Sequence, residues 1–196
     1  MTAVAPDPAL AWPLPYESVA LIGEFEGLRL VAYRCSAGVW TIGWGETDGV
    51  RPGDRCTKEQ ADRWLLEDLE ERVRAVRDAC TLPATDAELG AMVSLAYNIG
   101  MGWDPSKPKP KGAKDGFRQS TVLRQHNAGN HAAAARAFGL WNQITNPTTG
   151  QKEDDKGLTA RRAREASIYL SGAAQSAPMP QAVEPESKMT DSKIVK

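Results

Sequence analysis

The chain has 196 residues, of which 41% are hydrophobic and 25% are charged, and its formal net charge at pH 7 is −1. This length and composition can bury the core of one domain, whereas the nearly neutral charge argues against a general nucleic-acid binder. The apolar runs are too short to span a membrane, and the first 25 residues lack the basic start and apolar segment of a secretory signal. The sequence therefore predicts a soluble protein that is made in a cytosol.

Charge is distributed unevenly along the chain. Residues 1–100 carry a balance of −7, whereas residues 101–172 carry a balance of +6. A basic second half favours binding to an anionic polymer. An ordinary solvated surface explains the same balance equally well, so both interpretations stay open.

Residues 1–50 predict an arm, a helix and a small sheet. Residues 1–15 hold four prolines without periodicity, which predicts a flexible arm. Residues 16–30 place apolar side chains at helical spacing, and Gly27 stands where such a helix often ends. Residues 31–50 alternate β-forming side chains with glycines, which is typical of two or three short strands joined by tight turns.

Two capping boxes predict the next helices. Thr57 stands three residues before Gln60, and Thr85 stands three residues before Glu88; this spacing marks helix N-termini. A stripe of Leu and Val over 58–79 indicates a long amphipathic helix. The nearly continuous apolar run after Glu88 predicts a central, buried helix.

The rest of the chain is predicted to be mainly helical. Helical patterns cover 119–128, 130–143 and 158–171. Two polar, proline-containing stretches are predicted as exposed loops, at 103–116 and 145–157. Beyond Gly172 the composition is typical of a disordered tail or linker.

This order of elements defines the expected architecture. A helix, a small sheet, a long helix and a helix cluster follow one another, which indicates an α+β fold. A small antiparallel β lobe would be joined by the long helix to a mostly helical lobe. The expected division is an arm over 1–15, one domain over 16–172 and a tail over 173–196.

The three cysteines match no metal-binding spacing. Pairing of Cys56 with Cys80 is unfavourable because the intervening helix would hold its ends roughly 33 Å apart, whereas a disulfide needs Cα atoms within about 7 Å. Pairing of Cys35 with Cys56 stays geometrically open.

Glu26 is the first candidate for chemistry. It stands at the end of an apolar helix, where the following turn should place it beside the small sheet. Partial desolvation at such a junction favours a protonated carboxyl that can act as an acid. Most glutamates at helix ends are solvated surface groups, so position alone does not select Glu26.

The residues after Glu26 resemble the phage-type lysozymes of glycoside hydrolase family 24. The family motif is Glu, eight residues, Asp or Cys, five residues and Thr, and Glu26, Cys35 and Thr41 reproduce it with the spacing intact. The resemblance covers roughly residues 17–171. Matching segments occur at 21–33, 38–45, 60–62, 96–100, 120–124, 127–129 and 157–165.

The resemblance implies a lysozyme-like fold and hydrolysis of the β-1,4 bond between N-acetylmuramic acid and N-acetylglucosamine. Glu26 would protonate the leaving glycosidic oxygen. Cys35 and Thr41 would position a water molecule, or stabilise charge on the sugar, at the opposite face. The implied enzyme needs no cofactor.

Cys35 leaves three roles open. A cysteine thiol ordinarily has a pKa near 8.5, so at neutral pH it is a poor general base. It could orient water as a neutral partner, act as a thiolate nucleophile, or be structural in a weakened, wall-binding enzyme. A catalytic role is favoured because some family members carry Cys here. Oxidation, or pairing with Cys56, would then disable the enzyme.

Two aromatic or acidic positions are candidate substrate contacts. Glu46 stands where family members commonly carry His, and its carboxylate would supply charge that Cys35 lacks; a solvated sheet-edge residue is the competing interpretation. For Trp44, stacking on a sugar and packing in the core are equally favoured interpretations.

Four more candidates match family positions near the cleft, and capping or lobe-joining hydrogen bonds explain them equally well. They are Asn98, Ser120, Thr121 and Arg161. His126 and His131 are expected on an exposed helix–turn–helix, too far from any acidic motif to form a metal site.

The expected protein is a monomeric endolysin that binds peptidoglycan and no nucleic acid. It would be synthesised in the host cytoplasm, and a holin-type partner that permeabilises the membrane would let it reach the periplasm and wall. Two alternatives stay open: a catalytically weakened peptidoglycan-binding module, and a bacterial muramidase effector.

Overall fold

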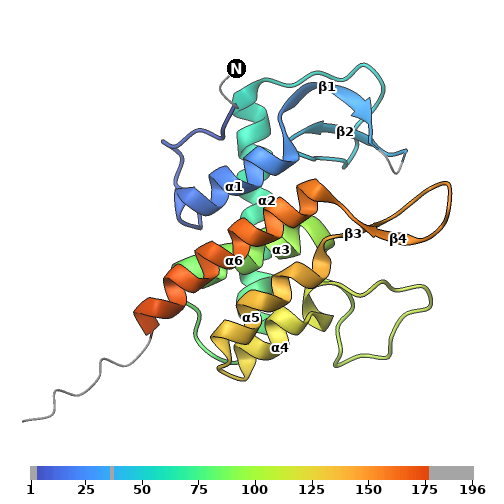
Figure 1. The fold of residues 1–196 in the computed structure, drawn as a ribbon. Helices are drawn as coiled ribbons and strands as arrows, with labels where there is room; N and C mark the ends of the chain where they lie inside the picture. Colours follow the sequence, from blue (N-terminus) through green and yellow to red (C-terminus); the bar gives the residue numbers. More distant parts are fainter. Residues whose placement is uncertain (1–3, 36–37, 177–196) are drawn as a thin grey trace, which may run out of the picture.

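The computed structural model describes residues 4–35 and 38–176, with side chains described up to Gly172. Its elements are α1 (Tyr16–Glu26), β1 (Arg29–Arg34), β2 (Trp40–Gly43), α2 (Lys58–Ala79), α3 (Asp86–Ile99), η1 (Phe117–Gln119), α4 (Thr121–Asn127), α5 (His131–Ala137), η2 (Phe138–Trp141), β3 (Gln143–Thr145), β4 (Lys152–Asp154) and α6 (Lys156–Ser176). The predicted α+β architecture is confirmed (Figure 1). The predicted tail from residue 177 on lies outside the described residues.

The small lobe is built on the antiparallel hairpin of β1 and β2. Tyr33 lies opposite Thr41 and Arg34 lies opposite Trp40, with an irregularity between Arg29 and Tyr33. The loop that follows adds an isolated bridge to β1 at Arg55. The small sheet that the glycine-punctuated sequence predicts is therefore present, with two strands.

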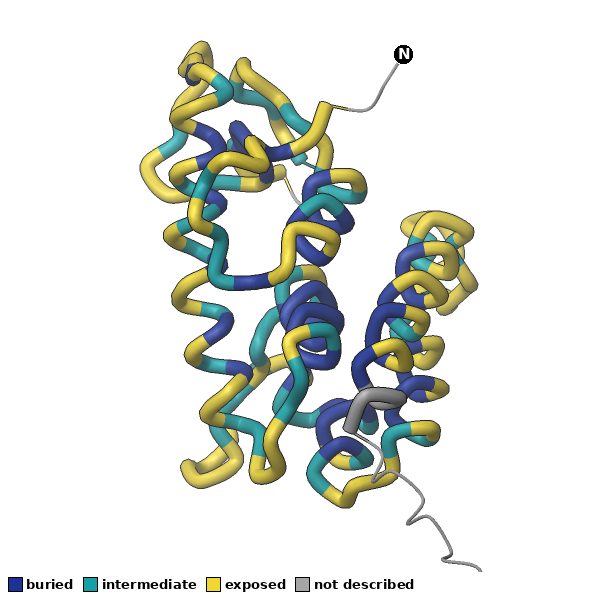
Figure 2. The backbone as a smooth tube through the Cα atoms, turned by 90° about the vertical axis from the view of Figure 1, so that its left-hand side faces the viewer, coloured by how far each residue is buried: buried dark blue, intermediate teal, exposed yellow. Residues whose placement is uncertain are grey.

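Helix α2 connects this lobe to the helical lobe. Thr57 caps its N-terminus, accepting from the N–H of Gln60, whose side chain accepts from the N–H of Thr57. The predicted capping box and its 22-residue helix are thus confirmed. Figure 2 shows the helix alternating buried and exposed positions along its length, as an amphipathic helix does.

Helix α3 is the centre of the molecule. Every residue from Glu88 to Ala96 is buried, and the helix packs against α1, α2 and α6. The second predicted capping box is also present, because Thr85 and Glu88 exchange the expected hydrogen bonds. The prediction of a central buried helix is confirmed, and Figure 1 shows α6 lying across it.

Two segments differ from the sequence-based expectation. The antiparallel hairpin of β3 and β4 spans 143–154, so it begins at the last residue of the helical pattern predicted over 130–143 and occupies most of the loop predicted over 145–157. In it Gln143 pairs with Asp154 and Thr145 with Lys152. Its strands are exposed and contain one apolar residue, Ile144, so no alternation of apolar residues predicts them. The turn is held by Asn146, whose N–H donates to the carbonyl of Gln151.

The described part of the N-terminal arm, residues 4–15, makes contacts with the domain. The N–H of Asp7 donates to Asp62 at 3.0 Å, and the hydroxyl of Tyr16 donates to the carbonyl of Pro6 at 2.8 Å. Pro6 lies over Gly23, where a Cβ would come within 2.6 Å of its ring. Among the described residues, no helix combines the length and apolarity needed to cross a membrane.

Candidate active site

Glu26 is the last residue of α1 and lies where the two lobes meet. The helix ends there because Gly27 adopts a φ of 71°, a left-handed conformation that favours glycine. The side chain of Glu26 is 22% exposed, and its Oε1 accepts a hydrogen bond of 2.7 Å from Nη1 of Arg161 on α6. One carboxylate oxygen is thus fixed while the group stays accessible.

Arg161 is held in turn by buried polar groups of α3 and α6. Its Nε donates to Oε1 of Glu165 at 3.1 Å, and its Nη2 donates to the carbonyl of Ser94 at 3.2 Å. The hydroxyl of Ser94 donates to the same Oε1 of Glu165 at 2.6 Å. Because Arg161, Glu165 and Ser94 are at most 2% exposed, the guanidinium is held rigidly against Glu26.

A second arginine extends this network to Asn98. Arg162 lies 3.1 Å from Oε2 of Glu165 and donates to Oδ1 of Asn98 at 3.0 Å. Burial lowers the pKa of Arg162 to about 10, so it keeps its charge at neutral pH. Burial also raises the pKa of Glu165, against the opposing charges of Arg162 and Arg161. The predicted site residues Glu26, Arg161 and Asn98 are thus linked by one chain of contacts.

Cys35 and Thr41 are both arranged around the carbonyl of Val39. The N–H of Cys35 donates to this oxygen at 3.0 Å and the hydroxyl of Thr41 donates to it at 3.2 Å. Gly38, with a φ of 77°, closes the turn by donating to the carbonyl of Cys35 at 2.8 Å. Thr41 is 4% exposed. The hairpin after α1 therefore fixes the backbone at both remaining motif positions.

Trp44 is a core residue. Its side chain is 2% exposed, and its indole N–H donates to Oδ1 of Asp62 at 2.7 Å. The carbonyl of Trp44 accepts from the hydroxyl of Tyr97 at 3.2 Å. Of the two interpretations that the sequence left balanced, this placement supports packing in the core, because the ring is enclosed by protein.

Glu46 lies at a cavity of about 360 Å³ between the small lobe and α2, which also has Trp64 and Tyr97 in its lining. Its Oε1 accepts the N–H groups of Thr47 and Asp48 at 2.6 and 2.7 Å, so the carboxylate stabilises the following turn. This contact supports the structural interpretation of Glu46, while its position at the cavity keeps it a candidate contact.

A second cavity, of about 530 Å³, brings together three predicted residues: Asn98, Ser120 and Thr121. Ser120 caps α4 by accepting from the N–H of Leu123 at 3.1 Å, and it is 2% exposed. Thr121 accepts from Arg124 at 2.8 Å. Of the three, Asn98 is exposed, so its amide is the best placed to meet a ligand.

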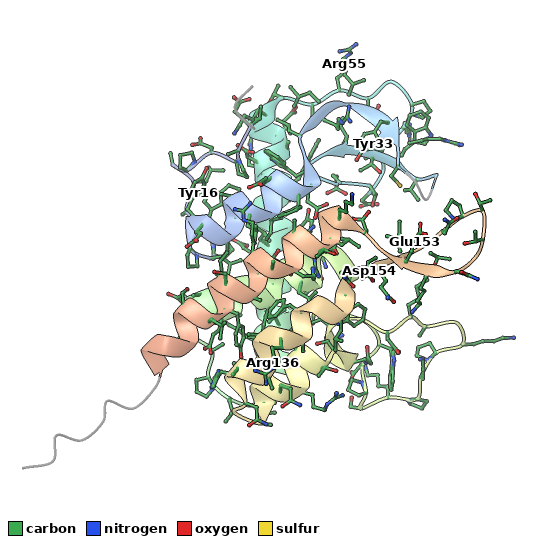
Figure 3. All side chains as sticks on the ribbon, viewed as in Figure 1. Tyr16, Tyr33, Arg55, Arg136, Glu153 and Asp154 are labelled. Atoms are coloured by element: carbon green, nitrogen blue, oxygen red, sulfur yellow. The ribbon has the colours of Figure 1, made fainter. Side chains whose placement is uncertain are left out.

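The same cavity includes residues that carry no recognisable signal in the sequence. They are Leu140, Trp141, Gln143, Lys152 and Leu158, together with Ile99 and Gln119. Gln143 and Lys152 belong to the β3–β4 hairpin, most of which lies in the stretch predicted as a loop. In Figure 3 this hairpin, marked by Glu153 and Asp154, and the small-lobe hairpin, marked by Tyr33, project on the same side of the molecule.

The cysteines and histidines lie in surroundings that differ from those of the Glu26 network. Cys56 and Cys80 are in no disulfide, and burial raises the pKa of both thiols. The two histidines are not on an exposed turn far from acids: His126 is fully buried, and Nδ1 of His131 lies 2.7 Å from Oε1 of Glu88. The sequence could not show this, because Glu88 is distant along the chain.

Glu26 ends a helix between the hairpin lobe and the helical lobe, and the buried Arg161 of the helical lobe holds it. This arrangement defines a two-lobed glycoside hydrolase of the lysozyme type. The chain belongs to the phage lysozyme family, whose model matches residues 23–165. This confirms the resemblance inferred from the motif and makes the chain a lysozyme.

Similar proteins cover most of the domain. An endolysin of Acyrthosiphon pisum secondary endosymbiont phage 1 is 33% identical over 155 residues, 79% of this chain and 96% of the relative. An endolysin from Escherichia coli O157:H7 phage FAHEc1 has a TM-score of 0.67 at 39% identity and covers 82% of this chain and 95% of its own. The muramidase domain of SpmX from Asticaccaulis excentricus has a TM-score of 0.69 at 36% identity, and the match covers 81% of this chain and 98% of that domain.

Proposed function

We propose that this chain is an endolysin muramidase that hydrolyses the β-1,4 bond between N-acetylmuramic acid and N-acetylglucosamine in bacterial peptidoglycan. The observation that carries the proposal is the contact of Glu26 with Arg161. It places an accessible carboxyl between the lobes and fixes one of its oxygens at 2.7 Å from a buried guanidinium. Positioning of an acid by a rigid neighbour is what glycoside hydrolysis requires.

In this mechanism Glu26 is the general acid. Its proton passes to the glycosidic oxygen as the bond from that oxygen to the anomeric carbon breaks. A water molecule attacks the anomeric carbon and releases a proton to solvent, and Glu26 takes up a proton from solvent, so that one product keeps the hydroxyl of the water and the net reaction consumes one water molecule. Arg161 acts as a positioning residue, because its own contacts with Glu165 and Ser94 restrict the orientation of Glu26.

Cys35 and Thr41 are proposed to place the water. The hydroxyl of Thr41 donates to the carbonyl of Val39, which leaves its oxygen lone pairs to accept a hydrogen bond from water. The thiol of Cys35 would be the second, neutral partner. Asn98, Thr121 and Lys152, at the larger cavity, are proposed to contact the glycan.

The names of two relatives bear on where the enzyme acts. Curated relatives include SAR-endolysins of Pseudomonas phage phiKMV and Enterobacteria phage P21. We infer that this chain, a monomer made in the host cytoplasm, acts on the wall from the periplasm and causes lysis. A holin-type protein would permeabilise the membrane for it.

The decisive experiment compares Glu26→Gln with Glu24→Gln. Both changes remove one carboxylate from the last turn of α1, but Glu24 is exposed and pairs with Arg164 on the outer side of α6. Turbidity of wall suspensions should fall with wild type and Glu24→Gln, and not with Glu26→Gln. Mass spectrometry of the fragments should show new reducing ends on N-acetylmuramic acid.

The similarity to a bacterial muramidase domain favours one alternative, a bacterial muramidase effector that cuts the same bond. The other alternative is a catalytically weakened glycan-binding module, and the same assay separates it from the muramidase. Wild type that sediments with the wall but releases no fragments would establish the binding module, and the proposal of a muramidase would fail.

A further inference from the structure

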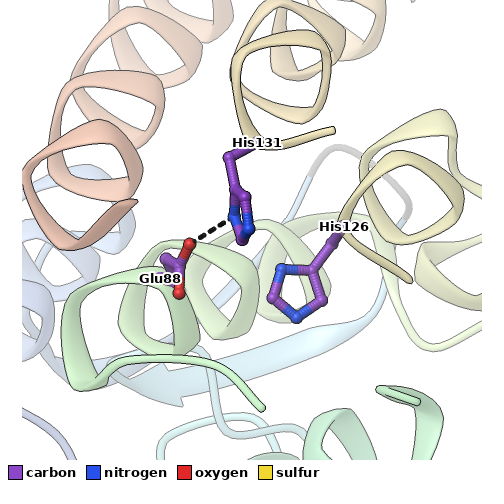
Figure 4. A group of neighbouring side chains, drawn as sticks. All are labelled: Glu88, His126 and His131. Atoms are coloured by element: carbon purple, nitrogen blue, oxygen red, sulfur yellow. Dashed lines mark ion pairs between the residues drawn. The ribbon is translucent and has the colours of Figure 1, made fainter. Parts of the chain in front are cut away.

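Both histidines of the chain lie together in the helical lobe, next to a buried carboxylate. His126 belongs to α4 and His131 to α5, and Glu88 is in the first turn of α3. Figure 4 shows the three side chains converging from these helices. One ligand atom from each residue lies within 4.8 Å of the other two. The whole sequence of 196 residues contains only two histidines, and both belong to this cluster.

We propose that Glu88, His126 and His131 form a binding site for a divalent transition-metal ion of the zinc class. Two imidazole nitrogens and one carboxylate oxygen are a ligand set that zinc accepts. Neighbouring ligand atoms of a tetrahedral zinc ion are about 3.3 Å apart. Small side-chain rotations that shorten each separation between ligand atoms by at most about 1.5 Å would therefore bring the three atoms to the spacing that zinc requires.

The outer contacts orient the ligand atoms toward a common point. Oε2 of Glu88 accepts the N–H and the hydroxyl of Thr85 at 2.9 and 3.1 Å, which turns Oε1 toward His131. Nε2 of His126 lies 3.4 Å from the carbonyl of Leu82, which turns Nδ1 inward. A metal-binding histidine characteristically gives its other ring N–H to a backbone carbonyl or a carboxylate.

Burial differs among the three proposed ligands. Glu88 and His126 are fully buried, whereas the side chain of His131 is 31% exposed, so it gives the site a route to solvent. Glu88 is the one acidic residue of the three, and its carboxylate would supply the negative charge that a cation needs.

A neutral oxygen is available for the open coordination position. The hydroxyl of Tyr169 on α6 lies 2.8 Å from Nδ1 of His126 and 3.3 Å from Nδ1 of His131. When a metal ion binds, this hydroxyl oxygen or a water molecule would complete four-coordination.

The proposed ion would stabilise the helical lobe and take no part in the chemistry at Glu26. Its ligands join α3, α4 and α5, and Tyr169 brings in α6. Tyr169 lies one helical turn after Glu165, so the site supports the same two helices that position Arg161. The effect to measure is therefore stability and metal content, which do not depend on the proposed muramidase activity.

The test uses the full chain without an affinity tag, stripped with a chelator and titrated with Zn²⁺ or Co²⁺. Native mass spectrometry should show one Zn²⁺ per chain, the Tm should rise with Zn²⁺ concentration, and Co²⁺ should give the absorption of a four-coordinate site. Glu88→Gln and His131→Gln should weaken Zn²⁺ binding by more than about tenfold. Asp86→Asn, an exposed charge in the same helix turn, should leave it unchanged.

The variants are chosen so that the result can be interpreted. Gln at position 88 still forms the capping box, so Glu88→Gln should remain folded, as its circular dichroism will show. The proposal is overturned if wild type binds no Zn²⁺, or if both variants bind it as tightly as wild type. A thiolate-to-cobalt charge-transfer band that disappears in Cys80→Ser would also overturn it, because the ion would then be held by a cysteine.

Discussion

Glu26 and Arg161 are 135 residues apart in sequence, and Nη1 of Arg161 donates to Oε1 of Glu26 at 2.7 Å. Arg161 is also paired with the fully buried Glu165. Arg161→Met should therefore have two effects: activity falls because Glu26 loses its positioning partner, and the free energy of unfolding falls by about 3 kcal/mol because a buried carboxylate loses a charged partner. Urea denaturation and wall digestion measure the two effects.

Arg164 provides the matched control on the same helix. It also reaches across to α1, where it pairs with Glu24, but both side chains are about half exposed. Arg164→Met should change the unfolding free energy by less than about 1 kcal/mol and leave turnover unchanged. Equal effects of the two substitutions would contradict a positioning role for Arg161.

Trp44 should behave as a core residue in a substitution experiment. Trp44→Phe removes the N–H that is donated to the buried Asp62, and leaving that acceptor short of a donor costs about 1–3 kcal/mol. Thermal unfolding should show this loss. KM for soluble glycan fragments should stay at the wild-type value in the folded variant, whereas a marked rise in KM would indicate that the ring contacts sugar after all.

The sequence predicts the parts of the fold that depend on local rules. Two capping boxes placed the starts of α2 and α3, glycine spacing placed the small sheet, and the motif spacing selected Glu26 from many helix-end carboxylates. The burial of Trp44 depends on Asp62, which is distant in sequence, and the partner of His131 is Glu88. Such contacts arise only when the helices pack, so no pattern along the chain announces them.

The β3–β4 hairpin cannot be predicted from the sequence for a different physical reason. Its strands have three residues each and are exposed on both faces, so burial imposes no alternation on their side chains. Turn chemistry at Asn146 stabilises the pairing instead, because its side chain accepts the N–H of Thr148 at 2.8 Å. In the sequence, Asn146 and Pro147 indicate only a loop.

Gly43 should be the most sensitive glycine of the small lobe. Its φ is 65°, and an added Cβ would lie 3.2 Å from the Cβ of Ala61 on α2. Gly43→Ala should cost about 1–2 kcal/mol for the left-handed backbone and more for the contact. Gly49 has a φ of 67° with open space around it, so Gly49→Ala should show the backbone cost alone. Equal Tm values for the two variants would contradict the close packing of β2 on α2.

Cys35 is expected to help place the attacking water from its position at the turn where its N–H donates to the carbonyl of Val39. Cys35→Asp introduces the other residue type that the family motif allows, and a carboxylate accepts a proton from water more readily than a neutral thiol does. Turnover at neutral pH should match or exceed wild type, while Cys35→Ala should lose about 10²-fold or more. Wild-type turnover in Cys35→Ala would make the side chain dispensable. Initial rates on wall suspensions decide this, with reductant present so that thiol oxidation does not contribute.

Cys80 gives the molecule a defined alkaline dependence of stability. Burial, with the charge of Glu88 adding to it, raises the pKa of its thiol from 9.0 to about 11. Between these values the folded chain keeps a proton that the unfolded chain releases, so the free energy of unfolding falls as pH rises from about 9 to 11 and is unaffected by this group below pH 9. Lysines and tyrosines titrate in the same range, so the measurement is a difference between wild type and Cys80→Ala, which lacks the thiol. Urea denaturation from pH 8 to 11 should show the steeper decline for wild type, and parallel declines would mean that the thiol is not desolvated by folding.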